Sequence, residues 1–158
     1  MILVTVGTQD KSFKRLINEV DKLVNNKVIK DEVVIQTGYT EYNGSINHFA
    51  FTSQDELDEL VKKCDILITH AGVGSIFKGL EYGKKVIAVP RLKKYHEHVN
   101  NHQLDISKNF EEAGYILVVN DMTDLGKTIK NIKKFVPKKL EIDNQELINT
   151  VEEFIDKI

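Results

Sequence analysis

Short runs of apolar and β-branched residues alternate along the chain with longer segments of helical periodicity, and this alternation limits the possible folds more than any other feature. Residues 2–6 form an almost uninterrupted apolar run, which is typical of a strand covered by helices on both faces. The runs predict strands at residues 2–6, 33–36, 47–51, 66–69, 86–89 and 115–119. Helical spacing predicts helices at residues 13–24, from Ser53 or Asp55 through Val61, and at 74–82, 97–112, 123–135 and 144–157. This order predicts an α/β protein with a Rossmann-like, open, mostly parallel sheet and helices on both faces.

The 158 residues have the size of one domain, and no linker interrupts them. We therefore expect residues 1–158 to form a single domain in which residues 135–158 are a C-terminal helical tail. The net charge of −2 argues against a nucleic-acid partner, and no apolar run approaches the roughly 20 residues that span a bilayer. Because the chain has one cysteine, Cys64, and no basic leader before its first strand, we expect a cytoplasmic protein with that cysteine in the core.

The turn after the fourth predicted strand has the composition of a ligand site. It consists of His70, Ala71, Gly72, Val73, Gly74 and Ser75. In parallel sheets, ligands bind beyond the carboxyl ends of the strands. The two glycines let a ligand approach the backbone, and the helix that begins near Ser75 offers unpaired N–H groups to phosphate oxygens. The turn is neither a Walker loop nor a dinucleotide fingerprint, since Phe77 stands where the latter needs glycine. Tight packing of strand against helix is the alternative explanation of the two glycines.

A polar segment at residues 89–103 follows the next predicted strand. Arg91 has the chemistry to pair with a phosphate. The donors and acceptors that sugar hydroxyls and a base require are offered by Glu97, Asn100, His102 and Gln103. A solvated helix start would also account for these residues.

Two further patterns have simple alternatives. His98 and His102 lie four residues apart and could share a metal ion, but there is no HExxH motif and no clear third ligand, so we predict no metal. A lysine-rich region comprises Lys127, Lys130, Lys133, Lys134, Lys138 and Lys139. A solvated helix face explains it, and contact with an anionic membrane or a partner is the alternative.

Together these segments resemble the C-terminal domain of glycosyltransferase family 28. That family has a His-Ala-Gly-x-Gly-Ser strand end, a Gly-Lys-x-x-Ile-x-x-Pro-Arg run and a Lys-Lys-Tyr-x-Glu-His-Val-x-x-His-Gln block. The chain has these at residues 70–75, 83–91 and 93–103, and its opening Val4–Thr8 also matches. The resemblance covers roughly residues 1–120, and the chain is most similar to the small PssE-type subunits of two-component galactosyltransferases for capsule and exopolysaccharide synthesis.

The resemblance implies one half of a GT-B fold, the half that binds the sugar nucleotide. It places the diphosphate at residues 70–75, the donor sugar and phosphates at Asn100, His102 and Gln103, and the acceptor-facing cleft at Gly7 and Thr8. Relatives carry an acidic residue for the ribose where this chain has Lys78. No catalytic base is assigned, although His98 is a fallback candidate, and no metal or cofactor beyond the UDP-sugar donor is expected.

The resemblance therefore implies the catalytic subunit of a two-component inverting glycosyltransferase. It would transfer a hexose, with UDP-galactose as one candidate donor, to a lipid-linked saccharide in surface polysaccharide synthesis. Its partner would be a membrane-associated, acceptor-binding subunit that holds it at the inner face of the membrane and without which it is inactive. A non-catalytic activating subunit and a sugar-nucleotide epimerase are the alternatives, although no extra carboxylates for an epimerase can be placed.

Overall fold

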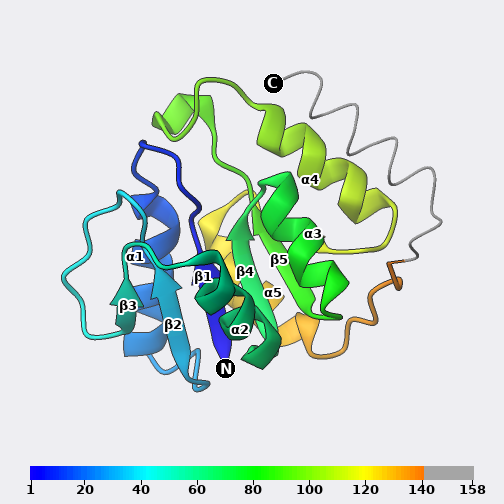
Figure 1. The fold of residues 1–158 in the computed structure, drawn as a ribbon, viewed down its shortest axis with the longest axis horizontal. Coiled ribbons are helices and arrows are strands. Elements are labelled where there is room, and N and C mark those ends of the chain that lie inside the picture. The colour runs from blue at the N-terminus through cyan, green and yellow to red at the C-terminus, as the bar shows by residue number, and fades with distance from the viewer. Residues whose placement is uncertain (141–158) are drawn as a thin grey trace.

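A computed structural model of the chain describes residues 1–140 and contains one six-stranded sheet between two layers of helices (Figure 1). The strands are β1 (Ile2–Thr5), β2 (Val33–Gln36), β3 (Asn47–Phe49), β4 (Ile66–His70), β5 (Lys85–Val89) and β6 (Leu117–Val118). The α-helices are α1 (Lys14–Asn25), α2 (Gln54–Lys63), α3 (Val73–Glu81), α4 (His102–Glu112) and α5 (Leu125–Ile132), with 3-10 turns at Lys93–Tyr95 and Met122–Asp124.

The sheet has the strand order β3-β2-β1-β4-β5-β6, and every described pair is parallel. The chain builds outward from β1 to β3 and then crosses to β4 on the other side of β1. The order therefore reverses between β1 and β4, and such a switch point is where open α/β sheets bind ligands. This arrangement confirms the predicted Rossmann-like fold.

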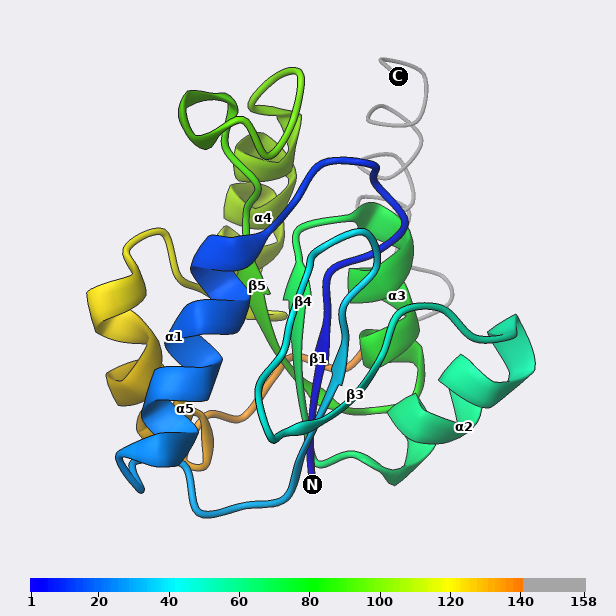
Figure 2. The same ribbon diagram turned by 90° about the vertical axis from the view of Figure 1, so that its left-hand side faces the viewer.

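Each face of the sheet is covered by its own group of helices, which Figure 2 shows edge-on. On one face, α1 and α5 pack residues such as Ile17 and Ile129 against the strands. On the other, α2, α3 and α4 contribute residues such as Ile76 and Phe110. Burial on both faces explains why the central strands read as continuous apolar runs. Cys64 lies in the second cluster with 1% of its surface exposed, as predicted, and burial raises the pKa of its thiol to about 11.

The structure differs from the prediction mainly before α4, which begins at His102 rather than near residue 97. His96 adopts a left-handed conformation (φ 58°) that ends the preceding 3-10 turn, and the side-chain oxygen of Asn100 accepts a hydrogen bond from the N–H of His102. The third and last strands are shorter than expected because pairing stops at Phe49 and Val118. The helix predicted at residues 144–157, and most of the predicted tail, lies outside the described residues. Within residues 1–140, no helix is long and apolar enough to cross a membrane.

Candidate functional site

The turn between β4 and α3 presents unpaired backbone donors at the switch point. Gly72 is the N-cap of α3 and forms no side-chain cap, and the first backbone bond of the helix joins the N–H of Ile76 to the carbonyl of Gly72. Among the described residues, the N–H groups of Val73, Gly74 and Ser75 therefore have no protein partner. The helix dipole adds partial positive charge at this point, so the turn can bind an anion.

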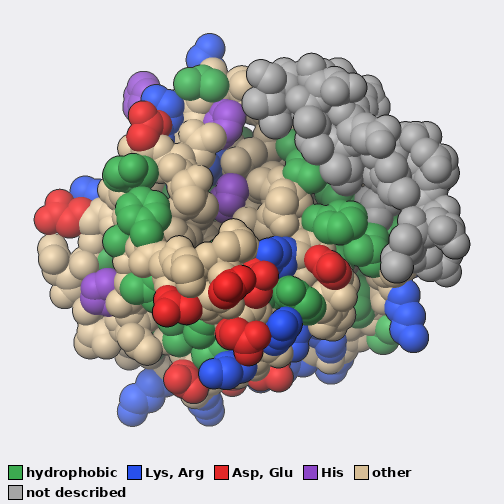
Figure 3. All heavy atoms as spheres, in the orientation of Figure 1, with side chains coloured by type: hydrophobic (Ala, Val, Ile, Leu, Met, Phe, Trp, Pro, Cys, Tyr) green, Lys and Arg blue, Asp and Glu red, His purple; other side chains and the backbone are tan. Residues whose placement is uncertain are grey.

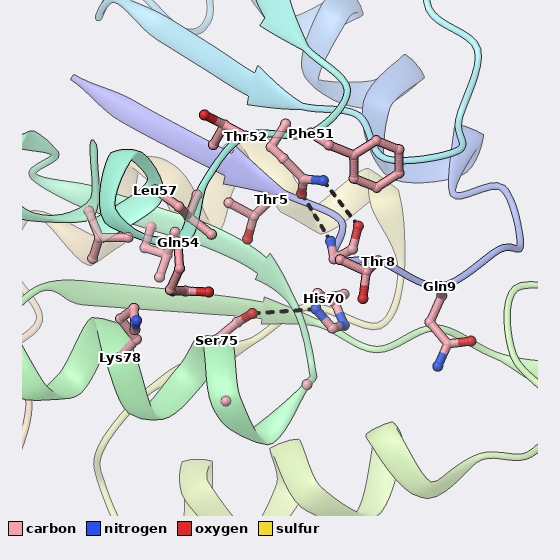
Figure 4. Close-up of a pocket in the computed structure, with 16 residues that line it drawn as sticks. Thr5, Thr8, Gln9, Phe51, Thr52, Gln54, Leu57, His70, Ser75 and Lys78 are labelled. Atoms are coloured by element: carbon pink, nitrogen blue, oxygen red, sulfur yellow. Dashed lines mark hydrogen bonds between the residues drawn. The ribbon is translucent and has the colours of Figure 1, made fainter. Parts of the chain in front are cut away.

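The imidazole of His70 fills the space beneath this turn. A Cβ atom at Gly7 would lie 2.5 Å from Nε2 of His70, and one at Gly72 would lie 2.3 Å from Cε1, so both glycines are required by the ring. Nδ1 of His70 lies 3.1 Å from Nε2 of Gln103. Nε2 of His70 lies 3.4 Å from Oγ of Ser75 (Figure 4). Burial and, secondarily, the charge of Arg91 lower the pKa of His70 to about 3. The imidazole is therefore neutral at physiological pH.

On the β1 side, the loop that carries Gly7 is held by Gln36, a residue that the sequence patterns did not single out. Oε1 of Gln36 accepts hydrogen bonds from the N–H groups of Val6 and Gly7, both at 3.0 Å. Its Nε2 donates to the carbonyl oxygens of Gly7 and Ala50. These bonds hold Gly7 at φ +79°, where a side chain would be strained. The available signal was a glutamine at the end of an otherwise apolar strand.

Two cavities flank the turn, and the surface there is hollowed with histidines at its walls (Figure 3). The first, of about 480 Å³, lies between the ends of β1 and β2, α2 and α3 (Figure 4). The predicted residues that line it are Gly7, Thr8, His70, Gly72, Gly74 and Ser75. The second, of about 740 Å³, lies between α3 and α4. The predicted residues that line it are His70, Ala71, Gly72, Val73, Gly74, His98, Asn100, His102 and Gln103.

Arg91 and Glu97 line neither cavity and have structural roles instead. Arg91 is fully buried, and its guanidinium donates to the carbonyl oxygens of Val6, Lys11 and Glu97. The carboxylate of Glu97 is 3% exposed and forms a two-point ion pair with Arg15. The predicted contact of Arg91 with a phosphate does not fit its position, because the side chain is fully buried and its two terminal nitrogens hold the loop after β1 against the segment after β5. Nε, which has no hydrogen-bond partner among the described residues, is buried as well.

The side chains at the start of α4 are partly engaged with one another. The side-chain oxygen of Asn100 accepts a hydrogen bond from the N–H of His102, the first residue of α4, and the backbone N–H of Asn100 donates to Nδ1 of His98 at 3.3 Å. Burial, and then the charges of Arg91 and His102, lower the pKa of His98. Within residues 1–140, no group of three or more metal-ligating side chains of His, Cys, Asp or Glu is present.

Lys78 lines both cavities from the second turn of α3. Its ammonium group pairs with the carboxylate of Asp58 on α2, which also accepts a hydrogen bond of 2.8 Å from Gln54. At the position where the resemblance places an acidic residue, the chain thus has a cation, Lys78, which is paired with a carboxylate of α2.

A model of the glycosyltransferase family 28 C-terminal domain matches residues 1–158. The chain belongs to this family. The assignment confirms the resemblance to family 28.

The sequence patterns resembled galactosyltransferase subunits. The curated relatives are instead named for N-acetylglucosamine transfer. The UDP-N-acetylglucosamine transferase subunit ALG13 of Candida glabrata is 30% identical over 123 residues, which are 75% of this chain and 59% of that protein. The human protein of the same name is 32% identical over 128 residues, which are 73% of this chain and 10% of that protein. The chain thus spans less than two thirds of the length of these relatives.

Solved structures show the same fold. The solution structure of ALG13 superposes with a TM-score of 0.64 at 19% identity, covering 95% of this chain and 94% of that one. The glycosyltransferase SnogD of Streptomyces nogalater superposes with a TM-score of 0.54 at 16% identity, covering 99% of this chain and 38% of that one. The chain therefore has the fold of one part of a larger GT-B glycosyltransferase.

Proposed function

We propose that this chain binds the sugar nucleotide of a glycosyl transfer and works as one subunit of a two-part, inverting hexosyltransferase. The observation that carries the proposal is the set of three unpaired N–H groups at the start of α3, placed between two cavities at the switch point of the sheet. A diphosphate bound at these N–H groups would place its two substituents in the cavities on either side.

The two cavities differ in the chemistry they offer. The cavity on the β1 side includes the half-exposed ring of Phe51 and the amide of Gln54, which suit stacking and hydrogen bonding to a nucleobase. The cavity on the α4 side includes His98, Asn100 and His102, whose polar atoms suit sugar hydroxyls. We therefore place the nucleoside on the β1 side and the hexose on the α4 side.

The chemistry that this chain contributes is stabilisation of the leaving nucleoside diphosphate. When the sugar–phosphate bond breaks, negative charge grows on the diphosphate, and fixed N–H donors with the helix dipole stabilise that charge without rearrangement. The base that activates the acceptor hydroxyl is assigned to the partner subunit. Within this chain only His98 is a fallback, with a pKa that burial holds below its usual range.

The exposed apolar side chains support a partner at this edge. Of the large hydrophobic residues exposed in residues 1–140, all but Val136 follow the carboxyl ends of strands; these are Tyr39, Phe51, Tyr95 and Val99. Phe51 and Val99 line the two cavities, and Tyr39 packs against Phe51. Exposed apolar side chains beside a ligand site are typical of a surface that another protein covers. We propose that the partner is membrane-associated and presents a lipid-linked saccharide, so that the chain acts at the cytoplasmic surface of a membrane.

UDP-N-acetylglucosamine is the first donor to test, because the curated relatives are named for it. UDP-galactose, which the sequence resemblance favoured, is the direct competitor. Isothermal titration of the chain with both UDP-sugars, UDP and a guanosine diphosphate sugar, alone and with the co-expressed partner, tests the proposal. We expect UDP ligands to bind in preference to the guanosine compound; no binding of any UDP ligand in the complex would refute a donor site.

The same complex distinguishes a catalytic from an activating subunit. A side chain at Gly74 would extend into the cavities at the start of α3, since Gly74 lines both of them and no described atom beyond its chain neighbours and its own helix backbone lies within 4 Å of the position that its Cβ would take. Loss of transfer in a Gly74→Leu complex is expected for a donor-binding subunit. Full transfer by that complex would mean that the chain only activates its partner.

A further inference from the structure

Gln103 joins two functional parts of the molecule through both ends of its side-chain amide. It lies in the first turn of α4 with 5% of its surface exposed. Oε1 of Gln103 accepts a hydrogen bond of 3.0 Å from the backbone N–H of Arg91, and Nε2 lies 3.1 Å from Nδ1 of His70. Both ends are therefore engaged within the protein, and one hydrogen of Nε2 and one lone pair of Oε1 are left for the sugar contact that the resemblance implied.

The backbone of Arg91 determines which way the amide points. A backbone N–H can only donate, so the atom facing it must be the carbonyl oxygen of Gln103. The NH₂ group then faces His70, and since this group can only donate, Nδ1 of His70 must accept. A neutral imidazole whose Nδ1 accepts carries its proton on Nε2.

We propose that Gln103 is a positioning residue that fixes the Nε2–H tautomer of His70, so that this histidine presents an uncharged hydrogen-bond donor to the bound diphosphate. Nε2 is the ring atom that faces Ser75 in the first turn of α3, and His70 lines both cavities. The identity of the anion rests on the proposed function, whereas the tautomer follows from the hydrogen bonds of the unliganded protein.

The alternative protonation states would weaken an anion site or leave the interior unsatisfied. The Nδ1–H tautomer would direct a lone pair of Nε2 towards phosphate oxygens and would set Nδ1–H against the NH₂ group of Gln103. An imidazolium would create the same donor–donor contact, and it would lie in the field of Arg91 and His98. The ring is also held in place, because it packs so closely against the backbones of Gly7 and Gly72 that a Cβ atom at either glycine would overlap it.

The tautomer can be read directly in the full chain by ¹⁵N NMR of the imidazole nitrogens, because a protonated and an unprotonated ring nitrogen have well-separated shifts. A His70→Gln variant assigns the signals among the five histidines. We expect Nδ1 of His70 to be unprotonated and Nε2 protonated, unchanged from pH 8 to pH 5. A protonated Nδ1 in the wild-type chain would overturn the inference whether or not any nucleotide binds.

The Gln103→Glu variant tests the role of the amide. A carboxylate still accepts from Arg91, but its second oxygen can only accept from His70, so Nδ1 should become protonated. We expect this change in the ¹⁵N spectrum together with a fall of about 10- to 100-fold in affinity for UDP, as for the loss of a hydrogen bond to a charged group.

The matched control is Asn100→Asp, which adds the same charge to the same α4-side cavity while keeping the acceptor for the N–H of His102. It should leave the His70 shifts unchanged even if added charge weakens UDP binding. If Gln103→Glu changes neither the His70 shifts nor the affinity for UDP, Gln103 does not position His70. If the wild-type chain has the expected tautomer but binds no UDP, the proposed function fails and the tautomer assignment stands.

Discussion

The turn at residues 70–75 and the segment at residues 90–103 lie side by side at the edge of the sheet, and both carry many polar groups. In the turn, three backbone N–H groups have no partner within the described chain, and Gly74 faces open space. In the segment, Arg91, Glu97 and Gln103 are buried, and their polar atoms bond mainly to other parts of the protein.

The difference between the two regions is one of hydrogen-bond satisfaction. A ligand can form bonds only with groups that the protein leaves free, whereas groups already paired inside the protein define the shape of the site. We therefore expect replacement of the buried Arg91 and Glu97 to affect mainly folding and replacement of residues in the turn to affect mainly binding, and the following predictions test that separation.

Replacement of Arg91 with methionine should have the largest effect and should act on stability. The variant removes the donor from three carbonyl oxygens, two in buried and one in a part-buried hydrogen bond, and removes a cation that lies near Glu97, so we expect a loss of about 3–5 kcal/mol in the free energy of unfolding. Urea unfolding followed by circular dichroism measures it. The exposed Lys93→Met variant removes the same charge and should change stability by less than about 0.5 kcal/mol. Normal stability with lost nucleotide binding in Arg91→Met would instead indicate a direct ligand contact.

Replacement of Gly74 with leucine should act on binding alone. The Cβ of the new side chain meets no neighbouring side chain within 4 Å, and leucine is a better helix former than glycine, so the melting temperature should stay the same or rise. It would occupy the space in front of the free N–H groups, and we expect affinity for UDP to fall about 100-fold, as for the loss of about 2.7 kcal/mol. Titration calorimetry on Gly74→Ala and Gly74→Leu should show a graded loss, and Lys127→Leu on the exposed face of α5 should show none. If Gly74→Leu lost stability as well as affinity for UDP, the proposed separation between residues for folding and residues for binding would be wrong.

The sequence predicted the features that depend on local residue patterns better than those that depend on burial in the assembled fold. The strands were predictable because burial on both faces leaves a continuous apolar run, and the turn was predictable because glycine and serine at the start of a helix are local signals. The role of Arg91 was not, because burial is a property of the assembled fold and the same residue type suits a phosphate or a carbonyl cluster. The start of α4 was missed for a similar reason, since the hydrogen bond between the N–H of His102 and the side chain of Asn100 follows the left-handed residue His96, which no periodicity indicates.

Lowering the pH should reduce the free energy of unfolding through His70, which lies where the two regions meet. Its pKa is about 3 in the folded protein and about 6.5 in the unfolded chain, so the unfolded state takes up a proton first. Its contribution to stability is complete above pH 6.5 and is lost as the pH falls towards 3. Between pH 7 and pH 5 the unfolded-state pKa sets the change, which we expect to be about 2 kcal/mol. Urea unfolding at both pH values should show a smaller change in His70→Gln, and an equal change would place the proton uptake elsewhere, His98 being the next histidine to examine.

The smallest predicted effect concerns Lys78, which lines both cavities but pairs with Asp58 rather than offering a carboxylate to a ribose. A carboxylate can accept hydrogen bonds from two ribose hydroxyls, whereas an ammonium group can only donate, so the wild-type chain should discriminate weakly between UDP and its 2′-deoxy analogue. The double variant Lys78→Glu with Asp58→Asn supplies the carboxylate and removes the like charge that would face it. We expect the ratio of the two affinities to rise about 3- to 10-fold, the value of one added hydrogen bond.

Asp58→Asn alone is the control, because it frees Lys78 without supplying an acceptor, and it should leave the ratio close to that of the wild-type chain. Competition titrations with both nucleotides measure the ratio directly, and they are insensitive to the amount of active protein. An unchanged ratio in the double variant would mean that the ribose does not lie beside residue 78, and that the nucleoside occupies the β1-side cavity in another orientation. If the ratio rises equally in the control, the freed ammonium group of Lys78 causes the discrimination. The turn would then bind its ligand with help from Lys78, a side chain that Asp58 of α2 holds in the wild-type chain.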